Sequence, residues 1–107
     1  MIHPSPQTLR KYGLTLGEWL EYAGERCLVC ERPWGEVKPV VDHEHVRRWK
    51  TMPPEERRRY VRGVVCISCN HFILTRYANP EKLRRAAEYL EAYETRRAIG
   101  SLSDGSS

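Results

Sequence analysis

Apolar and polar residues follow a helical spacing near the start of the chain, where two short helices are predicted. Ser5 followed by Pro6 is a helix start, and Gly13 is the expected end of that helix. Thr15 and Glu18 have the spacing of a capping box, so a second helix is expected to begin there. Its apolar residues, which we assign to the core, are Trp19, Leu20 and Ala23.

The middle of the chain changes to β-branched and alternating segments, which predict strands over residues 37–45 and 60–66. We expect these strands to pair as an antiparallel hairpin. Their long connection contains a proline pair that is expected to open a short helix over 55–60. Another helix, over 68–77, is predicted directly after the second strand.

The last apolar stripe has helical spacing and is preceded by a clear start signal. Asn79 is the expected cap and Pro80 the first residue of a helix that should run to about Ala98, with Gly100 as its end. Residues 101–107 are expected to form a disordered polar tail. The stripe consists of Leu83, Ala86, Ala87, Leu90 and Tyr93.

Length and composition fit one small α+β domain over residues 1–100, with a motif core at 27–77 and a C-terminal helix at about 80–98. The chain has 107 residues, of which 30% are charged and 40% apolar, as in a folded domain rather than a disordered segment. No stretch approaches the ~18–20 apolar residues of a membrane span, and no signal peptide is recognisable. We therefore expect a cytoplasmic protein with no membrane partner.

Positive charge is concentrated in one part of the chain. The formal net charge is +4, but the segment 47–62 alone carries seven basic residues against two acidic ones. Such density suits the phosphates of a nucleic acid, and a solvated surface loop is the alternative. Arg62 in particular is either a phosphate clamp or a decoration of its strand. The candidate nucleic-acid-binding residues are Arg47, Arg48, Lys50, Arg57, Arg58, Arg59 and Arg62.

All four cysteines belong to two Cys-x-x-Cys pairs, Cys27 with Cys30 and Cys66 with Cys69. Two such pairs complete a tetrahedron of thiolates, which predicts a closed structural Zn²⁺ site without an open catalytic position. Disulfides are the alternative, but short loops would strain them and an intracellular compartment disfavours them. A thioredoxin-type redox motif would need only one pair, in a βαβ context. Zinc binding would supply folding free energy on the order of 10 kcal/mol.

An acid, a histidine and an amide form a second constellation. Asp42 and His43 end the first predicted strand, and Asn70 follows the last cysteine directly. Carboxylate and amide oxygens suit a hydrated Mg²⁺ ion, and an imidazole is a base at neutral pH, so the set has the parts for phosphodiester hydrolysis. Taken singly, these residues are more often turn or helix caps. His45 and His71 could assist the site, contact phosphate or have no role.

The joint motif resembles the recombination endonuclease VII group of phage HNH nucleases. The resemblance is carried by Cys27-x-x-Cys30, by Asp42-His43-Glu44-His45, by Arg62-Gly63-Val64-Val65-Cys66-x-x-Cys69-Asn70, and by Asn79-Pro80-Glu81-Lys82-Leu83 with Ala86-Ala87-Glu88-Tyr89-Leu90. It covers roughly residues 27–90. It implies a ββα-metal (HNH, His-Me finger) core with a four-cysteine zinc site and flanking helices.

The resemblance also implies a role for each matching residue. Asp42 and Asn70 would bind the catalytic Mg²⁺ or Mn²⁺, His43 would be the general base, and His45 an accessory histidine. The expected products carry 5′-phosphate and 3′-hydroxyl ends. The stretch between His45 and Arg62 is longer and more basic than expected for the group, so its substrate contacts are expected to differ. The chain also stops soon after the last helix, so nicking or cutting of duplex DNA is favoured over resolution of branched DNA.

We therefore expect an endonuclease that acts on DNA in the cytoplasm, which is the host cytoplasm for a phage-encoded chain. A non-catalytic zinc module that binds nucleic acid is the alternative, although binding alone requires none of Asp42, His43 and Asn70. A structural zinc adaptor that binds protein through the final helix is a third class, and the basic segment counts against it. Further partners to consider are a second copy, through the C-terminal helix, and phage packaging or recombination proteins.

Overall fold

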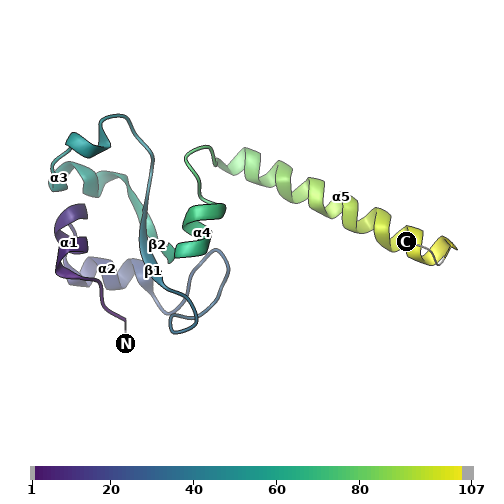
Figure 1. Cartoon of the computed structure of the whole chain (residues 1–107), viewed down its shortest axis with the longest axis horizontal. Coiled ribbons are helices and arrows are strands. Elements are labelled where there is room, and N and C mark those ends of the chain that lie inside the picture. Colours follow the sequence, from purple (N-terminus) through teal and green to yellow (C-terminus); the bar gives the residue numbers. More distant parts are fainter. Residues whose placement is uncertain (1, 105–107) are drawn as a thin grey trace. The chain divides into compact units, whose positions relative to one another are not determined.

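The computed structural model describes residues 2–104, with side chains described for residues 2–100 (Figure 1). The chain divides between Arg76 and Tyr77 into two compact units. The first unit combines short helices with a two-stranded sheet, and the second contains one long helix. The protein is therefore a small α+β protein, as predicted. No helix in the described part of the chain is long and apolar enough to cross a membrane.

Helices α1 (Pro6–Tyr12) and α2 (Leu16–Ala23) begin where the capping signals predict, and α1 ends at Gly13 as predicted. Ser5 Oγ accepts from the backbone N–H of Thr8 at 3.1 Å, and Thr15 and Glu18 form both hydrogen bonds of a capping box, at 3.1 and 2.9 Å. Gly13 ends α1 with a φ of +64°, and a Cβ at this position would lie 2.5 Å from the carbonyl oxygen of Pro54. A side chain there would therefore separate α1 from the segment that carries Pro54.

Strands β1 (Pro39–His43) and β2 (Val61–Cys66) form the predicted antiparallel hairpin. The register shifts between Asp42, which is opposite Gly63, and His43, which is opposite Val61, so Arg62 is the extra residue of a bulge. Strand β1 is shorter than the predicted 37–45. At its start, Val37 makes a bridge with Trp34 instead of pairing with β2.

The connection between the strands contains η1 (Trp49–Thr51), α3 (Pro54–Arg57) and η2 (Arg58–Tyr60). The last two occupy the place of the single helix predicted over 55–60. Helix α4 (Ile67–Phe72) follows β2 directly but is shorter than the predicted 68–77. The N–H groups of Ile73 and Leu74 both donate to the carbonyl of Cys69, at 3.0 and 2.8 Å, and this closes the helix early.

Helix α5 (Pro80–Asp104) begins as predicted, with Asn79 Oδ1 accepting from the N–H of Lys82 at 2.8 Å. Its predicted end at about Ala98 is wrong, because the helix continues through Gly100 to Asp104. A glycine inside a helix costs only about 1 kcal/mol relative to alanine, so it does not by itself end a helix. The predicted polar tail thus contains helical residues up to 104, and its residues 105–107 lie outside the described part of the chain.

The sheet separates two small cores on its opposite faces. Neighbouring strand residues point to opposite faces, and Val64 belongs to one core while Val65 belongs to the other. In Figure 1, α1 and α4 lie on opposite sides of the two strands. The first core contains Leu14, Trp19, Ala23, Val41 and Val64. The second contains Cys27, Val65, Cys66 and Cys69, with Trp34, Val37 and Leu74 packed against it.

Candidate metal centre and active site

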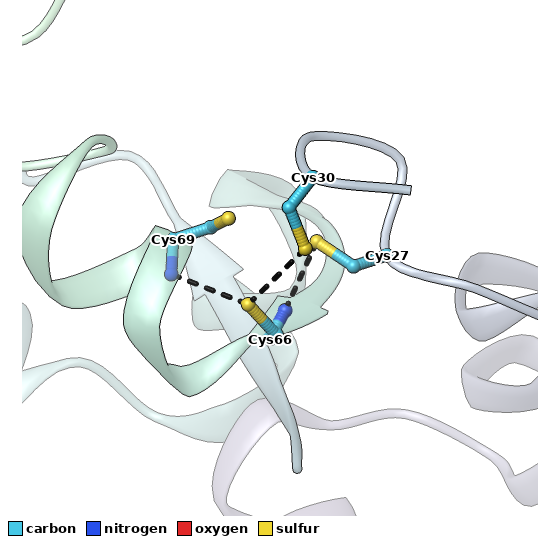
Figure 2. A group of neighbouring side chains, drawn as sticks. All are labelled: Cys27, Cys30, Cys66 and Cys69. Carbon is cyan, nitrogen blue, oxygen red and sulfur yellow. Dashed lines mark hydrogen bonds between the residues drawn. The ribbon is translucent and has the colours of Figure 1, made fainter. Parts of the chain in front are cut away.

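The four cysteines lie together, as their spacing predicts. Their sulfur atoms are all within 4.8 Å of one another, and all four are free thiols. Figure 2 shows the sulfurs pointing toward one another from the loop that carries Cys27 and Cys30 and from the start of α4. A zinc ion about 2.3 Å from each sulfur would set neighbouring sulfurs about 3.8 Å apart. The sulfurs of Cys30 and Cys66 are 3.7 Å apart, so the cluster fits one zinc ion.

The ionisation of the cluster also suits a metal. Burial raises the pKa of Cys27, but hydrogen bonds from the backbones of Cys30, Cys66 and Val29 outweigh it and lower this pKa to about 6. Burial and the neighbouring sulfurs raise the pKa of Cys69. One thiolate is thus stabilised while another thiol resists ionisation, and a dication would favour the thiolate form of both.

The loop that carries the first cysteine pair is held by its own backbone and by one tryptophan. The N–H of Cys27 donates to the carbonyl of Arg32, and the N–H of Glu31 donates to the carbonyl of Cys27, at 3.0 and 2.7 Å. The indole N–H of Trp34 donates to the carbonyl of Ala23 at 2.9 Å. Trp34 therefore connects the loop that carries Cys27 and Cys30 to the end of α2. The sequence did not indicate this role.

Asp42 is paired with Arg62. The Arg62 Nε and Nη2 atoms donate to the two oxygens of Asp42 at 2.7 and 2.9 Å, and Asp42 is only 3% exposed. Hydrogen bonding to Asp42 raises the pKa of Arg62. Each carboxylate oxygen has a further lone pair for another partner. Arg62 was predicted as a candidate phosphate ligand, and in the structure its guanidinium is paired with Asp42.

His43 has a defined hydrogen-bonding arrangement. Its Nδ1 lies 2.9 Å from the carbonyl oxygen of Glu44, and a carbonyl can only accept, so Nδ1 carries the proton. The lone pair of the neutral ring is then on Nε2. The imidazole is stacked on the indole of Trp49, with ring centroids 3.8 Å apart and planes 3° apart. The centroids of the Tyr12 and His45 rings lie 6.0 and 5.2 Å from the centroid of the His43 ring.

Asn70 lies on α4 and lines a cavity of about 570 Å³ that also borders Val40 and Val41. Val40 and Asp42 alternate along β1 and point to the same face of the sheet. Within the described residues, no hydrogen bond joins Asn70 to Asp42. His71 is exposed and makes an edge contact with the ring of Phe72.

Comparison with known proteins identifies the family. The family model of recombination endonuclease VII matches residues 6–92. The chain belongs to this family. It is 35% identical to the "Gene 59 protein" of Mycobacterium phage D29 over 98 residues, which are 86% of the chain and 52% of the relative. It is also 35% identical to the "Gene 59 protein" of Mycobacterium phage L5 over 88 residues, 77% of the chain and 46% of the relative. The chain thus spans about half the length of these relatives, and no solved structure matches it.

In this endonuclease VII family member, the basic segment divides into two groups. Three of its arginines are hydrogen-bonded within the chain. Arg57 donates to three backbone carbonyls, Arg58 donates to Glu18 and to the carbonyl of Gly13, and Arg62 donates to Asp42. The other four side chains make no hydrogen bond or ion pair with any residue that the structure describes. These are Arg47, Arg48, Lys50 and Arg59.

His43 and His45 lie at an open cleft of about 500 Å³. Partial burial, followed by the charges of His43 and Arg62, lowers the pKa of His45. The other residues of the cleft are Val46, Arg47, Arg48, Trp49, Lys50 and Arg76. Trp49 and Arg76 were not among the site residues predicted from the sequence. A tryptophan among so many cations was a signal for the first, whereas Arg76 lies outside the basic segment and had none.

Proposed function

We propose that this chain is a metal-dependent DNA endonuclease of the HNH endonuclease VII type, built on a ββα-metal core. The observation that carries the proposal is the tautomer of His43. Its Nδ1–H donates to the carbonyl of Glu44, so Nε2 is the proton acceptor, and the ring lines a cleft with several cations. A base beside positive charge suits hydrolysis of a phosphodiester.

The divalent cation, Mg²⁺ or Mn²⁺, would be held by Asp42 and Asn70. Asp42 is a buried carboxylate whose oxygens keep further lone pairs beside Arg62, and Asn70 supplies an amide oxygen from α4. Asp42 lies on the same face of β1 as Val40, and Asn70 and Val40 line one cavity. Hard oxygen donors of this kind fit either cation, which would stabilise negative charge on the phosphate.

The chain's own residues account for the rest of the reaction. Nε2 of His43 takes a proton from a water molecule, and the water oxygen forms a bond to phosphorus. The bond from phosphorus to the 3′ oxygen breaks, and the departing oxygen takes a proton from solvent water, which leaves a 5′-phosphate and a 3′-hydroxyl. The cleft cations Arg47, Arg48 and Lys50 bind the DNA backbone, with His45 as an accessory group.

The zinc, DNA and protein partners follow from the same proposal. The four-cysteine cluster holds a structural Zn²⁺, and duplex DNA is the proposed substrate, with branched DNA to be compared. A second copy through α5 is a further proposal, since Leu90 and Tyr93 are 57% and 48% exposed along that helix. Phage packaging or recombination proteins are also proposed partners, by analogy with the phage relatives.

One observation favours the alternative, a non-catalytic zinc module that binds nucleic acid: both oxygens of the Asp42 carboxylate already accept a hydrogen bond from Arg62. A plasmid assay separates the two functions. The nuclease nicks supercoiled plasmid with Mg²⁺, stops with a chelator, and is inactivated by His43→Ala with unchanged zinc content and melting temperature. A protein that binds plasmid but never nicks it, with either cation, is the zinc module.

A further inference from the structure

The indole of Trp49 contacts the proposed base rather than pointing to open solvent. The planes of the Trp49 and His43 rings differ by 3°, and their centroids are 3.8 Å apart. The centroid of the Tyr12 ring lies 5.9 Å from that of Trp49, and these two rings are tilted relative to each other. Trp49 is half-buried, although its neighbours in sequence, Arg48 and Lys50, are exposed. The tryptophan therefore packs inward, although the residues on either side of it are exposed.

Arg57 fixes the backbone that carries this indole. Its Nε donates to the carbonyl of Trp49 at 3.3 Å, and its Nη2 donates to the carbonyl of Lys50 at 3.2 Å. Its Nη1 donates to the carbonyl of Lys11, in α1, at 3.3 Å. The guanidinium also lies 5.3 Å from the centre of the Trp49 ring, within the range of a cation–π contact.

We propose that Trp49 is a positioning residue for His43 and that Arg57 is the brace that holds Trp49 in place. The inference rests on the proposed function, since it gives His43 the role of base. A single hydrogen bond at Nδ1 leaves the imidazole free to turn about that bond. A parallel indole fixes the plane of the ring and thereby the direction of Nε2. Such accuracy matters, because a displacement of about 1 Å can cost on the order of a hundredfold in rate.

A different role for Trp49 would be to stack on a nucleobase. Its ring already contacts His43, Tyr12 and Arg57, so a base would have to displace one of them. The same geometry moves Arg57 from the predicted phosphate ligands to the architecture of the site. The two roles differ in kinetics: positioning affects kcat, whereas DNA contact affects KM and binding affinity.

The test compares four variants of the full, zinc-loaded chain in plasmid nicking with Mg²⁺. Trp49→Ala is expected to lower kcat between about tenfold and a hundredfold with KM changed by less than about twofold, and Trp49→Phe to restore most of the rate. Arg57→Ala is expected to lower kcat in the same way. Arg32→Ala is the matched control, because Arg32 is an exposed arginine paired with Glu36 outside this site, and its rate should not change.

A second readout needs no activity. The indole ring current shields the ring protons of His43, so their NMR signals are expected to move downfield in Trp49→Ala and to move back toward the parent position in Trp49→Phe. If Trp49→Ala raises KM without lowering kcat, or if the His43 signals do not move, the proposal is wrong. If the parent protein never nicks DNA, the proposed function fails, and the NMR shifts still decide whether Trp49 holds His43. If Trp49→Ala does not fold, Trp49→Phe and Arg57→Ala decide by the same criteria.

Discussion

Arg62 holds the carboxylate of Asp42 through two hydrogen bonds, of 2.7 and 2.9 Å, across the bulge of the hairpin. The bulge makes this possible, because it gives β2 one extra residue beside the end of β1. Asp42 is almost completely buried, whereas the Arg62 side chain is 39% exposed. The pair therefore neutralises a buried charge from a partly solvated position, next to the proposed base.

Removal of Arg62 is expected to destabilise the fold. Arg62→Ala leaves the buried carboxylate of Asp42 without a counter-charge, a loss of about 3–5 kcal/mol for a fully buried pair. Because Arg62 is partly exposed, we expect Arg62→Ala to lower the free energy of unfolding by about 1–3 kcal/mol, measured by urea denaturation. Arg32→Ala is the control, since Arg32 and Glu36 are both 61% exposed, and it should cost less than about 0.5 kcal/mol. Equal losses in the two variants would show that the Asp42 pair contributes nothing beyond a surface ion pair.

Loss of one cysteine ligand is expected to remove the zinc and most of the stability of the first unit. Cys66 is 1% exposed and its sulfur is 3.7 Å from that of Cys30, so Cys66→Ser removes one of the four sulfur ligands. Zinc contributes on the order of 10 kcal/mol in small zinc-binding peptides, compared with about 1 kcal/mol for an average substitution. Zinc content by atomic absorption and melting by circular dichroism measure both effects. Ser68→Ala, an exposed change between two ligands, should leave one zinc per chain, and a Cys66→Ser protein that melts like it would exclude structural zinc.

His45 is expected to titrate below the ordinary value of about 6.5. Partial burial and then the charges of His43 and Arg62 lower its pKa, so the folded state favours the neutral ring. Protonation of His45 therefore opposes folding, and its contribution to stability is present at neutral pH and decreases as the pH falls through the ordinary value. NMR titration of the ring protons measures the midpoint, and Arg62→Gln should raise it by removing one charge. A midpoint at or above 6.5 would contradict the burial and charge described for this ring.

Local signals in the sequence predicted the caps and the metal cluster well. Thr15 and Asn79 act within one helical turn, and the spacing of the cysteine pairs alone indicated one shared centre. The end of α4 was predicted too late. The N–H groups of Ile73 and Leu74 both donate to the carbonyl of Cys69 and end the helix there, and no residue type in the sequence signals these two bonds. The partners of Arg57 and Arg62 were equally hidden, since they depend on where a loop and a bulge bring the backbone.

The basic segment contains both arginines that are bonded within the chain and basic side chains that are unpaired among the described residues. This difference leads to a prediction about how DNA affinity depends on salt concentration. Each phosphate contact adds about 0.9 to the slope of log affinity against log salt concentration, so the loss of one contact should lower the slope by about 1. Lys50 lines the cleft and its side chain pairs with no residue in the described part of the chain, so Lys50→Ala should reduce both DNA affinity and the slope. Arg58 is bonded to Glu18 and to the carbonyl of Gly13, so Arg58→Ala should lower the melting temperature and leave the slope unchanged. Fluorescence anisotropy with a duplex at several salt concentrations measures the slopes. If the slope falls equally in both variants, the arginines that are bonded within the chain also contact DNA. The separation into bonded and unpaired basic residues would then not describe DNA binding.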